Sequence, residues 1–340
     1  MQNKRHLARL VVASVLTISC SLTFSAEPAS WPAWRGPLRD GISLEKGLQN
    51  SWPEAGPKLL WQADELGRGF SSVSIANGRV ITMGELSKPE RGTYLIALSQ
   101  EDGQLLWKTR VGGGQPNTTP TIDEDRVYAL DREGQLTCVS ATNGDVLWEK
   151  NFPSDFGGKM MSGWGYSESP LIDGDQLICT PGSRTAALAS LDKRTGEVIW
   201  KTPIQSLGDR GGDGAAYSSI VASNAGGVKQ YVQLMGRGVI SVDASNGKLL
   251  WNYNRVANGT ANIPTPIVKG DYVFCSTGYG TGAALLKVQR GAREVEEVYF
   301  LRAKDLQNHH GGMVLIGDYL YCGHGHNNGF PICVDFKTGK

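Results

Sequence analysis

The chain has 340 residues, of which 40% are hydrophobic, so it can bury a substantial core as one large domain or two ordinary ones. Its formal net charge of +1 gives no electrostatic attraction for nucleic acid or for an anionic membrane surface, and neither is expected as a partner. Glycine supplies 44 residues, well above the usual share of roughly 7%, which indicates many tight turns rather than long helices.

Residues 1–26 have the pattern of a signal peptide. A basic stretch precedes an apolar run from Leu10 to Leu22, and small residues offer a cleavage point before Glu27. This pattern predicts export to the periplasm or secretion. Cys20 gives an alternative, because Ile18-Ser19-Cys20 resembles a lipoprotein cleavage box, although Thr17 stands where an aliphatic residue is usual.

Residues 27–57 are expected to form an irregular extension ahead of the folded domain. No later segment approaches the ~20 consecutive apolar residues that a membrane-spanning helix needs, so no transmembrane segment is predicted.

From residue 58 onward the chain is repetitive. An eleven-residue phrase occurs four times, as ALSQEDGQLLW, CVSATNGDVLW, SLDKRTGEVIW and SVDASNGKLLW, ending at Trp107, Trp148, Trp200 and Trp251. Its first position is always small (Ala97, Cys138, Ser190, Ser241) and its seventh is always glycine (Gly103, Gly144, Gly196, Gly247). A fifth copy, CVDFKTGK, starts at Cys333 and stops at Lys340.

A second phrase precedes the first in each unit and consists of small or proline residues, an aliphatic pair and a turn. Its turns centre on Gly78, Glu124, Gly174, Ala225, Gly270 and Gly317, with successive spacings of 46, 50, 51, 45 and 47 residues. The unit that follows Gly270 carries Tyr299 in place of tryptophan. The two phrases together predict six units.

Each unit contains four short strands separated by turns and shows almost no helical periodicity. Six such units predict an all-β fold, a β-propeller of four-stranded blades, over residues 58–340. Because one blade cannot bury both of its faces alone, each tryptophan is expected to wedge between adjacent blades.

The repeated phrase with its terminal tryptophan resembles the tryptophan-docking repeat of the quinoprotein-type, or PQQ-binding-like, β-propellers. The segments WPAWRGPLRDGIS, GWGYSESPLIDGD and NHHGGMVLIGDYLYCGHGHNNGFP are similar to those of a secreted bacterial branch of that family. The family contains quinone-dependent alcohol dehydrogenases and the BamB-type propellers of outer-membrane protein assembly.

Two accounts fit the ends of the propeller. The final phrase halts at TGK, while PKLLW at residues 57–61 is an isolated strand of the LLW type. Residues 58–64 could close a six-bladed ring by completing the sixth blade. Alternatively, as the resemblance favours, the sequence is a truncated eight-bladed propeller that forms an open arc with exposed edge strands.

The links between blades, and those between second and third strands, lie on one face of a propeller and are the longer, richer loops of this sequence. If the protein carries out the quinone chemistry of the family, the resemblance implies an axial pocket with calcium held by carboxylate and amide oxygens. Glu168, Asp213 and Asn262 could supply those oxygens, and the aromatic candidates beside the quinone are Trp164, Tyr166 and Tyr217. Each also has an ordinary interpretation as a turn or strand-cap residue.

Four of the five histidines fall within 18 residues, at His309, His310, His324 and His326. His324 and His326 are two residues apart and would project to one side of an extended segment, which is a common spacing for metal ligands and makes a transition-metal site possible. The alternative is that these imidazoles hydrogen-bond neighbouring loop backbones. Cys322 and Cys333 could face each other across one hairpin, which leaves a disulfide open.

The sequence therefore favours an exported β-propeller that acts as a binding or scaffolding module through its loop-rich face. Its expected partner is a protein or a small-molecule ligand. The alternative is a PQQ- and calcium-dependent oxidoreductase of alcohols or sugars. The adjacent cysteine pair of many quinoprotein alcohol dehydrogenases and a C-x-x-C-H haem motif are both missing from the sequence.

Overall fold

The computed structural model describes residues 30–340, so the predicted signal peptide lies outside the described residues. The strands group into six antiparallel sheets, five of four strands and one of three. The first two sheets are β1 (Ser74–Ala76), β2 (Arg79–Leu86), β3 (Gly92–Ser99) and β4 (Leu105–Gly112), then β5 (Thr121–Asp123), β6 (Arg126–Leu130), β7 (Gln135–Ser140) and β8 (Val146–Asn151).

The third and fourth sheets contain β9 (Leu171–Asp173), β10 (Gln176–Cys179), β11 (Ala189–Asp192) and β12 (Val198–Lys201), then β13 (Val221–Ser223), β14 (Gln230–Met235), β15 (Gly238–Asp243) and β16 (Leu249–Tyr253). The last two contain β17 (Ile267–Lys269), β18 (Tyr272–Thr277), β19 (Gly282–Val288) and β20 (Val295–Arg302), then β21 (Val314–Ile316), β22 (Tyr319–His324) and β23 (Phe330–Asp335). The helices of the described part are α1 (Phe152–Phe156), η1 (Ala225–Gly227) and η2 (His326–Asn328). None of these is long and apolar enough to cross a membrane.

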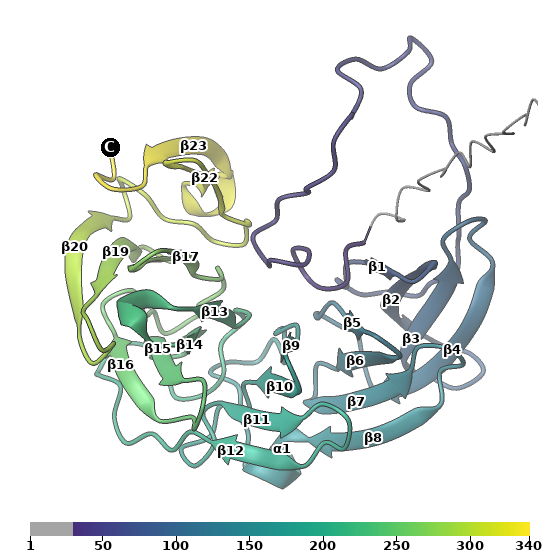
Figure 1. Cartoon of the computed structure of the whole chain (residues 1–340), viewed down its shortest axis with the longest axis horizontal. Helices are drawn as coiled ribbons and strands as arrows, with labels where there is room; N and C mark the ends of the chain where they lie inside the picture. The colour runs from purple at the N-terminus through teal and green to yellow at the C-terminus, as the bar shows by residue number, and fades with distance from the viewer. Residues whose placement is uncertain (1–29) are drawn as a thin grey trace, which may run out of the picture.

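The sheets follow one another around an axis with their first strands innermost, and Figure 1 shows them as an open arc. This arrangement confirms the predicted all-β propeller of four-stranded blades, including the fourth blade, whose first turn centres on Ala225 rather than on a glycine. Closure by residues 58–64 is not found. The sixth sheet has three strands, and residues 58–64 form no strand.

The repeated phrase has one register in every blade that carries it. Its small first residue lies directly opposite the tryptophan of the next strand, as in Ala97 opposite Trp107 and Cys138 opposite Trp148. Directly after the small residue the pairing shifts by one, in β3–β4, β7–β8, β11–β12 and β15–β16 alike. A small side chain is needed here because the large indole occupies the adjacent space.

The tryptophans dock between blades as predicted. Three of the four predicted indole rings, and that of Trp61, lie on the turn glycine of the following blade, in the pairs Trp61 with Gly103, Trp107 with Gly144, Trp148 with Gly196 and Trp200 with Gly247. A methyl group added at these glycines would come within 2.5, 2.7, 2.8 and 2.3 Å of the nearest ring atom, respectively. In the described part of the chain, Trp251 contacts no such glycine and is buried in a core cluster that includes Val273 and Cys275 of the fifth blade. Tyr299 takes the same place beside Gly339, and its hydroxyl donates to the carbonyl of Phe336 at 2.9 Å.

A second set of contacts links the innermost strands around the axis. The backbone N–H of Ser72 donates to the hydroxyl of Thr119, and the same bond recurs from Thr119 to Ser169, Ser169 to Ser219 and Ser219 to Thr265, at 3.0 to 3.3 Å. We call these five residues the hydroxyl belt. It joins the first five blades, and the next position in the repeat is Gly312, which has no side chain to continue it.

Residues 31–41 cross the open side of the arc and touch four blades, which Figure 1 shows as the dark purple chain near its centre. Trp31 pairs with Ile75 of the first blade, and the carbonyl of Pro32 accepts from the N–H of Ile122 in the second. Arg39 is buried and donates to the carbonyls of Ser169 and Pro170 in the third blade at 2.7 and 3.0 Å. The guanidinium of Arg35 donates to the carbonyl of Met313 in the sixth. This segment is therefore an internal brace.

The cysteines of residues 30–340 are all free. Across the last hairpin, Cys333 lies opposite Tyr321 and Cys322 lies opposite Ile332, so the two thiols project to opposite faces of the sheet. The proposed disulfide between them is not formed, because their positions are one residue out of register.

Candidate functional site

The loop-rich face of the third to fifth blades is built from three long connections. These are residues 157–170 after α1, residues 202–220 before β13 and residues 254–266 before β17. The first two are held together by a parallel bridge between Met160 and Ala215, with backbone hydrogen bonds of 2.8 and 2.9 Å on either side. The loops are thus ordered by backbone pairing rather than by side chains alone.

Tyr217 is the junction of these connections. Its hydroxyl lies 2.5 Å from Oγ of Ser162 and accepts from the N–H of Trp164 at 3.4 Å, while Ser162 also donates to the carbonyl of Thr260. Tyr217 is buried, whereas Trp164 is 67% exposed. Of these two predicted aromatic candidates, the tyrosine holds a loop in place and the indole is largely exposed to solvent.

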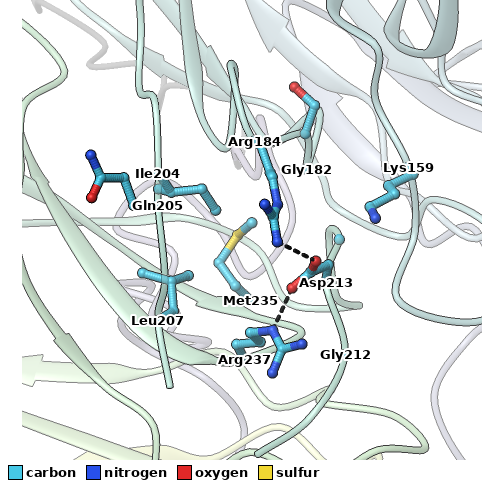
Figure 2. A pocket seen from close by; sticks show the side chains of 12 residues that line it. Lys159, Gly182, Arg184, Ile204, Gln205, Leu207, Gly212, Asp213, Met235 and Arg237 are labelled. Atoms are coloured by element: carbon cyan, nitrogen blue, oxygen red, sulfur yellow. Dashed lines mark hydrogen bonds and ion pairs between the residues drawn. The ribbon is translucent and has the colours of Figure 1, made fainter. Parts of the chain in front are cut away.

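Asp213 lies between two arginines in what we call the clamp, Arg184, Asp213 and Arg237. Arg237 Nε donates to one carboxylate oxygen, and Arg184 Nη2 lies 3.6 Å from the other (Figure 2). The hydrogen bond from Arg237, with the positive charges of Arg237, Lys159 and Arg184, lowers the pKa of Asp213. The cavity beside the clamp measures about 20 Å³, which is room for a single water molecule.

Glu168 and Tyr166 are brought inside the protein rather than to the mouth of a pocket. Glu168 is 2% exposed, and its Oε2 accepts from the N–H of Thr180 at 2.7 Å. Its Oε1 has no hydrogen-bond partner among residues 30–340, and burial raises its pKa to about 8. Tyr166 packs edge-on against Phe152 at 5.2 Å and donates to the carbonyl of Pro181.

Asn262 is fully used by backbone contacts. Its amide nitrogen donates to the carbonyls of Met235 and Gly236, and its oxygen accepts from the N–H of Asn258. The oxygens of Asp213 are paired with arginines and those of Glu168 are buried. Among the described residues, Oε1 of Glu168 has no partner but is buried, and the oxygens of Asp213 and Asn262 contact protein groups. As arranged, these three side chains do not fit a calcium-bound quinone.

The histidines lie together on the loops of the fifth and sixth blades. The ring centroid of His309 lies 3.9 Å from that of His310 and 4.1 Å from that of His326. Nε2 of His309 is 2.9 Å from the hydroxyl of Tyr279. His324 stands apart from this stack, and its Nδ1 accepts from the N–H of Gln307 at 3.1 Å. In residues 30–340 no group of three or more His, Cys, Asp or Glu side chains is arranged to hold a metal ion. A transition metal here stays a prediction.

Sequence reasoning missed the basic residues of this face. Arg184 lies between β10 and β11, and Arg237 lies in the β14–β15 hairpin, so both come from turns that carry no motif. Arg39 was also missed, because its partners are the carbonyls of residues 130 positions away. No spacing in the sequence predicts such pairs.

Comparison with known proteins shows which family this sequence matches. The sequence profile of the family described as outer membrane protein assembly factor BamB matches residues 54–151 and 91–340. This chain belongs to that family. It is 25% identical over 225 residues to the outer membrane protein assembly factor BamB of Shewanella oneidensis, an alignment that covers 53% of this chain and 52% of that protein. The chain thus spans about half the length of this relative.

Solved structures agree on the fold. BamB of Moraxella catarrhalis superposes with a TM-score of 0.56 at 14% identity, covering 81% of this chain and 74% of that one. The quinohemoprotein alcohol dehydrogenase of Comamonas testosteroni superposes with a TM-score of 0.58 at 12% identity, covering 91% and 59%. At such identities the likeness concerns the fold alone, and it agrees with the predicted propeller of four-stranded blades.

Proposed function

We propose that this protein is an exported binding module that docks a protein partner on the loop-rich face of its third to fifth blades. The observation that carries the proposal is Trp164, an indole 67% exposed on a loop that is fixed by Tyr217 and by pairing with residue 215. Tryptophan and arginine are enriched among binding hot spots, and a fixed loop lowers the entropy lost on docking.

The clamp supports a macromolecular partner rather than a small ligand. Pockets for small molecules usually measure about 300 to 1,000 Å³, and the cavity at the clamp is about 20 Å³. Arg184 is 72% exposed and lies 3.6 Å from Asp213, so most of its donors are available to an acidic group of a partner. The family membership suggests that the partner belongs to the machinery that assembles outer-membrane proteins.

The test is binding of the purified protein to the periplasmic domains of the host's outer-membrane assembly machinery, measured by biolayer interferometry. We expect W164A/R184A to weaken binding at least tenfold, the loss of roughly one hot-spot residue. The matched control is L147A/K248A, which removes an exposed apolar and an exposed basic side chain outside this face. Equal binding by the two double variants would refute the proposed surface.

A parallel titration addresses the oxidoreductase alternative. PQQ is added with Ca²⁺ to the full chain, the quinone absorbance is followed, and dye reduction is assayed with alcohols and sugars. We expect no shift, because Asp213 and Asn262 are occupied by protein contacts. A saturable shift that E168Q abolishes would instead support the enzyme.

A further inference from the structure

A second charged feature lies on the first blade, apart from the clamp. A hollow of about 650 Å³ is lined by the basic side chains of Arg68, Lys88, Arg91 and Lys108, together with Glu65 and Glu85. We call it the basic hollow. Arg68 precedes β1, Lys88 and Arg91 belong to the β2–β3 loop and Lys108 lies on β4, so three separate parts of the blade converge on it.

The floor of the basic hollow is Glu85, whose side chain is only 3% exposed. Its Oε2 accepts from Arg68 Nη2 at 2.9 Å and its Oε1 accepts from Arg91 Nε at 2.9 Å. These bonds lower the pKa of Glu85, the one from Arg91 most strongly, so the carboxylate is held ionised. The arginine side chains are 71% and 75% exposed, so one buried carboxylate orients two guanidinium groups at the surface.

The backbone beneath these groups is also fixed. Arg68 and Glu85 exchange two backbone hydrogen bonds of 3.1 and 2.7 Å. The two backbone segments approach so closely that a methyl group at Gly84 would come within 1.8 Å of the carbonyl oxygen of Leu66. Both arginines are therefore presented from a rigid support, which reduces the entropy lost when they bind a ligand.

The charges indicate what the hollow would bind. Four cationic side chains line it against the two carboxylates Glu65 and Glu85, which leaves a net charge of +2. A guanidinium has five N–H donors in a planar fork, and the bonds to Glu85 leave donors on both arginines free. Paired forks with flanking ammonium groups suit a doubly charged tetrahedral oxyanion better than a single carboxylate.

We propose that the basic hollow is a phosphoryl-binding site, which takes inorganic phosphate or the phosphomonoester headgroup of a lipid. Arg68 and Arg91 bind the phosphoryl oxygens, Lys88 and Lys108 add charge, and Glu85 is a positioning residue that does not touch the ligand. The site is independent of the protein-docking face.

The first test is titration of the exported chain with inorganic phosphate, by calorimetry and by ³¹P line broadening, against chloride at equal ionic strength. We expect R68Q/R91Q to weaken binding at least tenfold, because both charged guanidinium groups that bind the phosphoryl oxygens are removed. The control K201Q/K248Q removes the same charge from exposed lysines of the third and fourth blades. Failure to bind phosphate saturably, or an equal loss in the control, would overturn the proposal.

A second comparison separates orientation from charge. E85Q makes the hollow more positive but removes the group that aims the arginines, and R68K/R91K keeps the charge but removes the forks. We expect both variants to bind phosphate more weakly, with an unchanged thermal transition in R68K/R91K. If R68K/R91K binds as tightly as the unmodified chain, the hollow is only a diffuse positive surface and the proposal fails.

The source of the phosphoryl group is distinguished with vesicles of phosphatidylcholine, with and without phosphatidic acid. Co-sedimentation that requires phosphatidic acid and is displaced by inorganic phosphate identifies a lipid headgroup. Phosphate binding without co-sedimentation identifies a soluble ligand. Co-sedimentation of R68Q/R91Q equal to that of the unmodified chain counts against the site.

Discussion

The contact between Trp200 and Gly247 allows the packing of a tryptophan on the turn glycine of the next blade to be tested by adding one methyl group. Gly247 has a φ of +72°, and an added methyl group would lie 2.3 Å from the indole ring. Gly247→Ala therefore meets two costs, a left-handed backbone conformation and displacement of a buried ring. Gly270→Ala is the matched control, because its φ is +55° and nothing lies within 4 Å of the added methyl group.

The left-handed conformation alone costs about 1 kcal/mol for alanine, which is the loss expected for Gly270→Ala. Complete loss of a buried tryptophan costs about 3–5 kcal/mol, and a displaced ring should lose about half of that. We therefore expect Gly247→Ala to lower the free energy of unfolding by about 3 kcal/mol.

The assay is urea unfolding followed by circular dichroism, extended to the double variant W200A/G247A. Once Trp200 is removed, the ring clash disappears, and Gly247→Ala should cost only about 1 kcal/mol more than W200A alone. If Gly247→Ala and Gly270→Ala are equally destabilising, or if the two changes at positions 200 and 247 are additive, the indole does not dock on this glycine as described.

Three further predictions concern Glu168, Arg39 and the cysteines. The folded protein holds a proton on Glu168 up to about pH 8, whereas the unfolded chain releases it near the ordinary value of 4.5, so stability should fall as the pH rises between these values, by about 3 kcal/mol at pH 7. Glu168→Gln should abolish that slope in urea titrations at several pH values, and an unchanged slope would mean that Glu168 is already ionised. Arg39→Ala leaves the carbonyls of Ser169 and Pro170 without their donors and should cost about 2–4 kcal/mol in thermal or urea unfolding, against no measurable loss for the exposed Arg290→Ala. Cys333 should react with a thiol reagent in the native protein, whereas buried Cys138, Cys179, Cys275 and Cys322 should react only after unfolding, and rapid native labelling of all of them would contradict the packed blades.

Much of the fold could be predicted because the repeat shows the same local physics several times. The small residue, the turn glycine and the tryptophan recur together because one contact demands all three. The degenerate fifth blade keeps only part of this pattern, because Tyr299 lies beside Gly339 but the residue opposite it is Leu285 rather than a small one. The first hairpin of the fourth blade was predicted near Ala225 from the segment SSIVASNAGGVKQYV and the repeat spacing, although its turn is the short helix η1 rather than a tight glycine hairpin.

The candidate site was less predictable, because its contacts join loops that the repeat does not describe. The sequence placed Glu168, Asp213 and Asn262 on one face, and they are on successive connections. It could not show that Asp213 is neutralised by Arg237 from the next hairpin, or that Asn262 bonds to backbone carbonyls. Face and neighbourhood follow from topology, whereas the direction and partner of a polar side chain depend on long-range packing.

The interruption of the hydroxyl belt at Gly312 has a mechanical consequence. N–H to hydroxyl hydrogen bonds connect the first five blades near the axis, and the sixth blade lacks such a bond. The sixth blade should therefore separate from the arc more easily than any other. Deuterium uptake should therefore be fastest in β21 to β23 and should slow toward the middle of the arc. The sixth blade would then move as a rigid body relative to the other five blades, which stay fixed to one another.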